Sequence, residues 1–214
     1  MGIFQNINDE ELTKILSRIN TKTKEYLRGE QIFSENDLCN SIAIVKRGTI
    51  KAIHNYSDGH EKIIRILNKD EIIGITLLFS ANPKYKASFI SDTISTVQII
   101  SKKDLLYLME INPIIMENVL RIISDYSIRL NEHIKLLSYK TIRSKLCAFL
   151  FLEYQRTKMP SFVIEYTKTE LAALLNVERP SLSFELSKLI NEGIIGNQNK
   201  LYTIININKL EKEL

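Results

Sequence analysis

The residues from Pro113 to Leu137 constrain the fold of this chain more than any other stretch. Apolar residues recur there at alternating steps of three and four, the spacing of the seam between two helices of a coiled coil. The predicted seam consists of Met116, Val119, Ile123, Tyr126, Leu130, His133 and Leu137. Apolar flanks widen the stripe, with Ile115, Ile122 and Leu136 on one side and Leu120 and Ile134 on the other. We therefore predict a helix over residues 113–137 that joins two copies of the chain; the alternative is an ordinary amphipathic core helix.

Short β-branched and aromatic runs fill the sequence before this helix, between Lys24 and Ser101. Turn residues separate the runs, as in Arg47-Gly48 and in residues 57–59. Short antiparallel strands at this spacing predict a β-sandwich or a small barrel. Helical spacing over residues 7–19 and 102–109 predicts one helix before the strands and one after them.

A pair of short helices is predicted further along, after a helix over residues 141–156 and a strand over 162–166. Thr167 and Glu170 form a capping box that opens the first of the pair, and Pro180 suits the first turn of the second. The side chains expected to face the core are Leu171, Leu174, Leu175, Val177, Leu182, Leu186 and Leu189. Two helices with this turn length and inward pattern predict a helix-turn-helix.

Two sets of residues carry a family resemblance. The succession RGEQIFSEND, IAIVKRGTIKAI, SDGHEKIIRIL and IIGITLLF resembles the cyclic-nucleotide-binding-type β-roll of the Crp-Fnr family of bacterial transcription regulators. The string RPSLSFEL, from Arg179 to Leu186, matches the family's recognition string RPSLSREL at seven of eight positions. The resemblance covers nearly the whole chain and implies an α+β fold. Its three parts are an effector-sensing β-roll with an N-terminal helix at 1–112, a dimerisation helix at 113–137 and a winged helix-turn-helix DNA-binding domain at 138–214.

The resemblance also implies a homodimeric, sequence-specific regulator that binds double-stranded DNA and is not an enzyme. Residues 193–195 and 201–205, with a turn at 196–199, would form the wing of the helix-turn-helix. The residues expected to bind phosphates are Lys168, Thr169, Lys188 and Lys200, and those expected to read or border base edges are Arg179, Ser181, Ser183 and Phe184. A two-fold dimer would read a palindromic operator. RNA polymerase is a further partner that such a regulator could contact.

Phe184 stands where the family string has an arginine. Arginine commonly donates two hydrogen bonds to guanine in the major groove, which phenylalanine cannot do. The favourable partner for a phenylalanine ring on a base edge is the thymine methyl group. We therefore hypothesise half-sites rich in A·T pairs, with Arg179 as the reader of any remaining guanine. The alternative is a ring that folds back against the wing and reads nothing.

The candidate effector pocket departs from the cyclic-AMP-binding members of the family, which carry a carboxylate for the ribose and an arginine for the phosphate. Ile75 stands at the carboxylate position and Tyr85 at the arginine position, and Lys86 lacks the bidentate fork of arginine. The pocket would consist of Gly74, Ile75, Thr76, Tyr85, Lys86, Ala87 and Ser88. Cyclic AMP is therefore not the expected effector. A cyclic-AMP-responsive or a ligand-free regulator of the same fold remains the alternative, and the effector stays unidentified.

Few residues in this chain could ligate a metal or an iron–sulfur cluster. Cys39 and Cys147 lie in different predicted domains, too few for a four-thiolate site, and we expect both to be small packed side chains. Haem is not expected, because His133 belongs to the predicted seam. A cupin-type barrel enzyme is the rival from another class, but it would need a His/Glu cluster, and the roll has only His54 and His60.

Net charge and hydropathy indicate what the chain binds and where in the cell we expect it. The net charge is +4, and the residues from Ser138 onward contribute most of it, which is compatible with nucleic acid binding. No apolar run approaches the roughly 20 residues of a membrane span, and the first residues lack the features of a signal peptide. We expect a cytoplasmic protein without a membrane partner.

Overall fold

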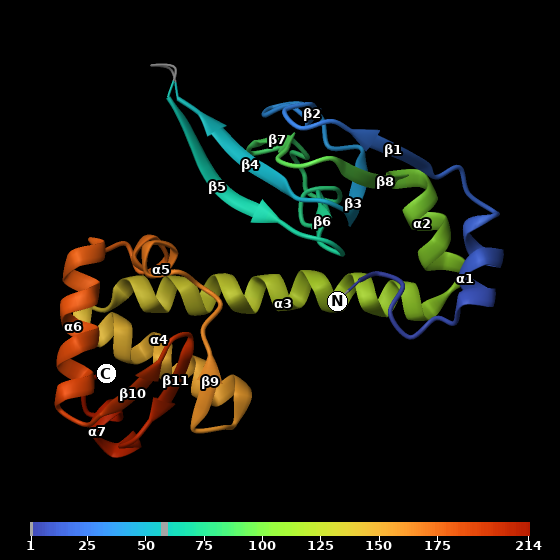
Figure 1. The fold of residues 1–214 in the computed structure, drawn as a ribbon. Coiled ribbons are helices and arrows are strands. Elements are labelled where there is room, and N and C mark those ends of the chain that lie inside the picture. The colour runs from blue at the N-terminus through green and yellow to red at the C-terminus, as the bar shows by residue number, and fades with distance from the viewer. Residues whose placement is uncertain (1, 57–59) are drawn as a thin grey trace. The chain divides into compact units, whose positions relative to one another are not determined.

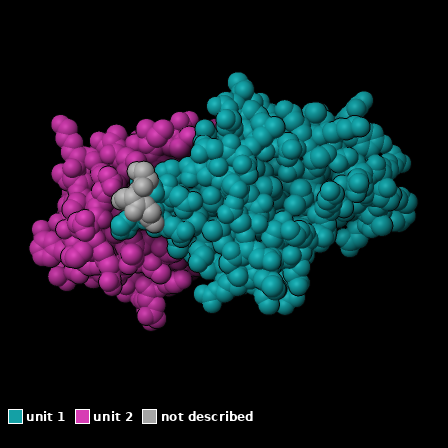
Figure 2. Space-filling model, turned by 90° about the horizontal axis from the view of Figure 1, so that it is seen from above, with its two compact units in different colours: residues 1–126 teal, residues 127–214 magenta. Residues whose placement is uncertain are grey.

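The computed structural model describes residues 2–56 and 60–214 and has an α+β architecture (Figure 1). Contacts divide the chain into two compact units, Met1–Tyr126 and Ser127–Leu214, which are coloured separately in Figure 2. The dividing point lies within α3 (Pro113–Ser138), so one continuous helix belongs to both units. The division into three parts at residues 112 and 137 stays a prediction.

The first unit contains two four-stranded antiparallel sheets, with strand orders β1-β8-β3-β6 and β2-β7-β4-β5. The strands are β1 (Lys22–Tyr26), β2 (Gln31–Phe33), β3 (Ser41–Arg47), β4 (Ile50–Asn55), β5 (Glu61–Leu67), β6 (Ile72–Ile73), β7 (Ser88–Ser91) and β8 (Ser95–Ser101). Side chains from both sheets, such as Ile42 and Ile50, meet in one apolar core. The predicted β-sandwich is confirmed, while the predicted turn at 57–59 lies outside the described residues.

Gly48 makes the turn between β3 and β4, and no other residue type fits there. Its φ of +82° lies in the left-handed region, which disfavours residues that have a Cβ. A Cβ at this position would also overlap the side chain of Ser95 and the carbonyl oxygen of Ile94. The turn residue that the sequence singled out is therefore fixed by both backbone conformation and space.

Three helices accompany the roll: α1 (Asp9–Leu16), α2 (Lys102–Ile111) and the first part of α3. Asn112 caps α3, since its Oδ1 accepts the N–H of Ile114 at 2.9 Å, and its amide donates to Glu11 at 2.9 Å. The amide of the buried Asn118 donates to the carbonyl oxygens of Ile3 at 3.1 Å and Gln5 at 2.7 Å. These bonds tie the N-terminal segment to the start of α3.

The second unit surrounds a separate core with helices and a small sheet of order β10-β11-β9. Its elements after α3 are α4 (Ile142–Thr157), β9 (Ser161–Val163), α5 (Lys168–Leu174), α6 (Arg179–Asn191), β10 (Ile195–Gln198), β11 (Leu201–Ile204) and α7 (Ile207–Glu211). The core residues from the helix pair are Leu171, Leu175, Leu182, Leu186 and Leu189. The predicted helix-turn-helix and the hairpin that follows it are confirmed.

Several predicted boundaries were wrong by a few residues. The first helix is shorter than 7–19, and the strand expected over 162–166 ends at Val163. The first wing strand continues through Gly196 to Gln198, so the turn is made by Asn199 and Lys200, with Asn199 at a φ of 59°. Val177 is half-buried rather than buried. None of the helices formed by residues 2–56 and 60–214 is long and apolar enough to cross a membrane.

Replacement of Asn118 by alanine tests how the start of α3 is anchored. We expect the free energy of unfolding to fall by about 1–3 kcal/mol, because the carbonyl oxygens of the buried Ile3 and the half-buried Gln5 lose their donor. Urea unfolding of the variant and the wild type measures the difference. Asn131→Ala, at an exposed position of the same helix, is the matched control. Equal stability of both variants and the wild type would contradict the anchoring role.

Candidate functional site

The helix α5 begins at the capping box that the sequence predicted. The Thr167 side chain accepts the N–H of Glu170 at 3.2 Å, and the Glu170 carboxylate accepts the N–H of Thr167 at 2.7 Å. Hydrogen bonds to the Glu170 carboxylate from the Thr167 backbone and then from the Thr167 side chain lower the pKa of the Glu170 carboxyl. Local hydrogen bonds therefore hold the start of α5, which includes the exposed Lys168 and Thr169.

The other end of α5 is bound by side chains from two neighbouring helices. His133 Nε2 lies 2.8 Å from the carbonyl oxygen of Leu174, and Lys145 Nζ donates to that of Leu175 at 3.1 Å. Basic side chains at a helix C-terminus satisfy carbonyl groups that have no partner within the helix. His133, which was predicted in the dimer seam, is half-buried and its ring is bound within its own unit, so its place in a seam stays a prediction.

The helix α6 presents two different faces. Leu182, Leu186 and Leu189 are buried, and Phe184 on the opposite face is 61% exposed. Lys188 Nζ lies 4.5 Å from the centroid of the Phe184 ring, within the range of a cation–π contact. Most of the ring is therefore open to solvent, which does not favour the alternative of a ring folded back against the wing.

The predicted DNA-binding residues all lie in the second unit. Six of them are exposed, namely Lys168, Thr169, Arg179, Phe184, Lys188 and Lys200, and two are half-buried, Ser181 and Ser183. Lys200 sits in the turn between the wing strands, where its Nζ lies 3.3 Å from the carbonyl oxygen of Glu165. Their roles toward DNA stay predictions, but most are free to meet a ligand from solvent.

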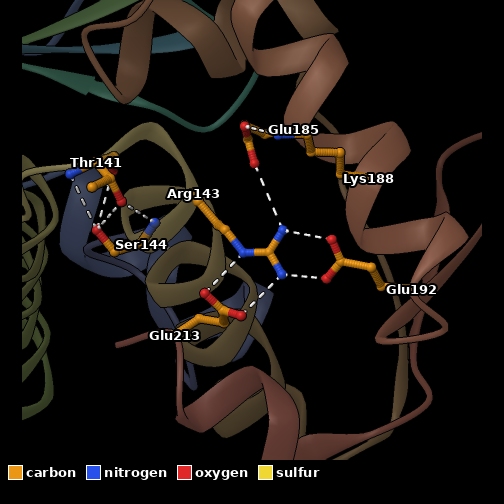
Figure 3. A network of polar contacts seen from close by, with 7 residues as sticks. All are labelled: Thr141, Arg143, Ser144, Glu185, Lys188, Glu192 and Glu213. Atoms are coloured by element: carbon orange, nitrogen blue, oxygen red, sulfur yellow. Dashed lines mark hydrogen bonds and ion pairs between the residues drawn. The ribbon is translucent and has the colours of Figure 1, made fainter.

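Arg143 forms a network that the sequence did not predict (Figure 3). Its guanidinium pairs with Glu192 at the end of α6, with Glu213 at 2.8 Å and with Glu185 at 3.8 Å. The hydrogen bond from Arg143 lowers the pKa of the Glu192 carboxyl. Since these partners lie 42 to 70 residues beyond Arg143, no local motif could have revealed the network. The network ties the C-terminal half of α6 to α4.

A stripe of exposed residues runs along α3, and we call it the outer stripe. It consists of Met116, Leu120, Ile123, Ser127, Leu130, Ile134 and Leu137, at alternating steps of four and three; Ile123 is half-buried and the others are exposed. Val119 was predicted in the seam, which was wrong, because it is 1% exposed and belongs to the core of the first unit. Tyr126 is exposed beside the stripe.

The predicted effector pocket is largely packed with its own side chains. Tyr85 is 1% exposed, its ring stacks on Phe33 with centroids 4.5 Å apart, and Phe89 meets it edge-on. Burial raises the pKa of the Tyr85 hydroxyl, which donates to the carbonyl oxygen of Ser41 at 3.3 Å. Of the seven predicted residues, Ile75, Tyr85, Ala87 and Ser88 are buried, Gly74 is half-buried, and Thr76 and Lys86 are exposed.

Cys39 belongs to the same packed region, next to Gly74. Its thiol lies 3.6 Å from the carbonyl oxygen of Ser41 and 3.7 Å from that of Gly74. Burial raises the pKa of the Cys39 thiol, and it also raises that of Cys147, in the other unit, to about 12. Within residues 2–56 and 60–214, no three His, Cys, Asp or Glu side chains form a group that could hold a metal ion.

Comparison with known proteins supplies the family. Residues 23–112 match the cyclic nucleotide-binding domain, and residues 144–213 match the Crp-like helix-turn-helix domain. The chain belongs to the Crp-Fnr family. Its members are DNA-binding transcription regulators, so this chain is one as well, and the predicted resemblance is confirmed.

Individual relatives are distant but cover most of the chain. The cyclic AMP receptor protein of Thermus thermophilus is 24% identical, over 90% of this chain and 87% of its own. The fumarate and nitrate reduction regulatory protein of Vibrio cholerae is 22% identical, over 94% of this chain and 81% of its own. A solved structure of a CooA variant from Carboxydothermus hydrogenoformans has a TM-score of 0.72 at 20% identity, covering 99% of this chain and 95% of that one. That similarity shows that the Crp-Fnr fold is shared.

Cyclic AMP should neither bind this chain at micromolar concentration nor change its affinity for DNA. The reason is that Ile75 and Tyr85, both buried, occupy the places where a carboxylate and an arginine would hold the nucleotide. Isothermal calorimetry is the direct measurement. The cyclic AMP receptor protein of Thermus thermophilus is the positive control in the same buffer. Clear micromolar binding to this chain would refute the pocket argument.

Proposed function

We propose that this Crp-Fnr regulator acts as a homodimer that reads an inverted repeat in double-stranded DNA through α6. The outward face of α6 carries this proposal: the aromatic ring of Phe184 and the cation of Lys188 stand together in solvent, opposite three buried leucines. A recognition helix enters the major groove with such a face, while its buried side fixes it to the domain. Arg179, Ser181 and Ser183 are the other base readers in this proposal, and Lys168, Thr169 and Lys200 bind phosphates.

The outer stripe of α3 supports the homodimer. Its heptad spacing matches what a two-stranded coiled coil needs at its seam. An exposed and largely apolar stripe of this kind, interrupted at Ser127, is typical of an interaction site. A two-fold axis along paired α3 helices would relate the two copies of α6, and recognition helices about 34 Å apart read half-sites one helical turn apart.

The proposed effector is not cyclic AMP. The aromatic cluster around Tyr85 supports this, because a nucleotide would have to displace the buried Tyr85 ring and the half-buried rings of Phe33 and Phe89 that pack on it. The relatives' names do not agree on a signal, since one is a cyclic AMP receptor protein and another a fumarate and nitrate reduction regulatory protein. A β-roll that binds a different effector and a β-roll that binds none are both consistent with this packing. An effector that binds the roll would change DNA affinity through the geometry of α3.

Family membership does not favour the cupin-type enzyme. Each unit has a binding role instead. The β-roll supports the dimer or shifts its geometry, and the helix-turn-helix binds DNA. RNA polymerase is a further proposed partner, because transcription regulators act on the transcription machinery.

Selection of bound sequences from a random DNA pool tests the function. We expect the full-length chain to enrich an inverted repeat whose half-sites lie one helical turn apart. Phosphate neutralisation should make the affinity fall steeply with salt, because counterions are released on binding. The control is a variant with Lys168 and Lys188 both changed to Gln, for which we expect weaker binding and a shallower dependence on salt. Recovery of unenriched DNA would contradict a sequence-specific regulator.

A paired substitution, Ile123→Asp with Leu130→Asp, tests the dimer. Four carboxylates would then meet across the two-fold axis, at a cost of several kcal/mol even after protonation. Analytical ultracentrifugation should show a monomer, and affinity for the inverted repeat should drop sharply. Ile128→Asp is the control, because Ile128 is 56% exposed on the same helix but lies off the outer stripe. A dimer that survives the paired substitution would place the seam elsewhere.

A further inference from the structure

The exposed ring of Phe184 is unusual for a residue of its type. At 61% exposure it forgoes most of the burial that normally stabilises a phenylalanine. Lys188, one helical turn further along α6, holds its ammonium 4.5 Å from the ring centroid. The cation covers one face of the ring and restrains its orientation. The rest of the ring is therefore presented to solvent in a defined direction.

Most helical neighbours of the ring on the outward face of α6 are cationic or polar, beside the exposed Pro180. Ser181 lies one turn before Phe184 and Lys188 one turn after it, while the nearby acid, Glu185, is engaged by Lys188 at 3.4 Å and by Arg143 at 3.8 Å. A protein-docking surface typically surrounds an aromatic anchor with further apolar contacts. A single ring among a cation and hydroxyl groups instead matches a groove lined with phosphates that offers one apolar group.

The major groove offers such a group only at thymine, whose C5 methyl lies among hydrogen-bonding atoms. We infer that Phe184 is the thymine-reading residue of this regulator: its ring contacts the methyl of one thymine in each half-site, and Lys188 binds a phosphate beside it. The inference rests on the proposed function, since it names what the α6 face recognises. A phenylalanine side chain cannot donate hydrogen bonds to guanine, so we expect thymine at that position in both half-sites.

Deoxyuridine isolates this contact, because it differs from thymidine only by the missing C5 methyl of the base. Each symmetric pair of thymines in the selected operator is replaced in turn by deoxyuridine, and the dissociation constant is measured by fluorescence anisotropy. We expect the wild type to lose about fourfold in affinity per half-site at one symmetric position, the effect of burying a single methyl group. Phe184→Ala should bind the thymine and deoxyuridine operators equally well at that position.

Two further variants sharpen the result. Asn191→Ala changes another exposed side chain of α6, about two turns beyond Phe184, and should keep the wild-type ratio. Phe184→Arg should replace the preference for thymine by one for guanine at the same position. Because Phe184 is exposed, we expect all of these variants to unfold at the wild-type urea concentration.

The outcomes separate the inference from the function on which it rests. Equal discrimination between thymine and deoxyuridine by the wild type and Phe184→Ala would overturn the inference, while an enriched inverted repeat would leave the proposed function standing. Identical selected sequences for wild type and Phe184→Arg would overturn it too. Failure of the wild type to enrich any inverted repeat would overturn both together.

Discussion

Helix α3 carries apolar residues on two faces, and the rest of the structure depends on which of these faces is buried. One side completes the cores of the units to which the helix belongs, through Ile115 and Val119 in the first and Leu136 in the second. The other side keeps the outer stripe exposed along nearly the whole helix. An α-helix completes one turn every 3.6 residues, so residues three and four apart lie on one face. The buried stripe and the outer stripe can therefore run side by side along α3 on different faces. The proposed dimer follows from the stripe that the single chain leaves uncovered.

The sequence predicted this helix and its double role, but it placed Val119 in the seam, although that side chain is buried in the core of the first unit. Val119 and Leu120 are adjacent, as are His133 and Ile134, and either choice gives steps of three and four. Periodicity alone does not tell which stripe faces the chain's own cores, because the answer depends on contacts with distant segments. His133, for instance, turns inward toward a carbonyl oxygen 41 residues away.

Local chemistry was predicted better than long-range chemistry. The capping box at Thr167 needs only four residues, and it was found where it was expected. The Arg143 network joins residues from α4, α6 and the C-terminal end, so only the folded chain reveals it. The effector pocket of the β-roll was predicted in part. Ile75 and Tyr85 indicated that the pocket differs from a cyclic-AMP site, but only the structure reveals that Phe33 stacks on Tyr85.

The Arg143 network also sets up a gradient of charge along the recognition helix. Arg179 begins α6, where the helix dipole adds positive partial charge. Toward the other end, Glu185, Glu192 and Glu213 surround one guanidinium and outnumber it. Lys188, on the outward face of the same half of α6, pairs with Glu185 and keeps a positive charge beside these carboxylates. The carboxylates near the end of α6 are thus held by cations of the protein itself, whereas at the start of the helix Arg179 and the helix dipole act together.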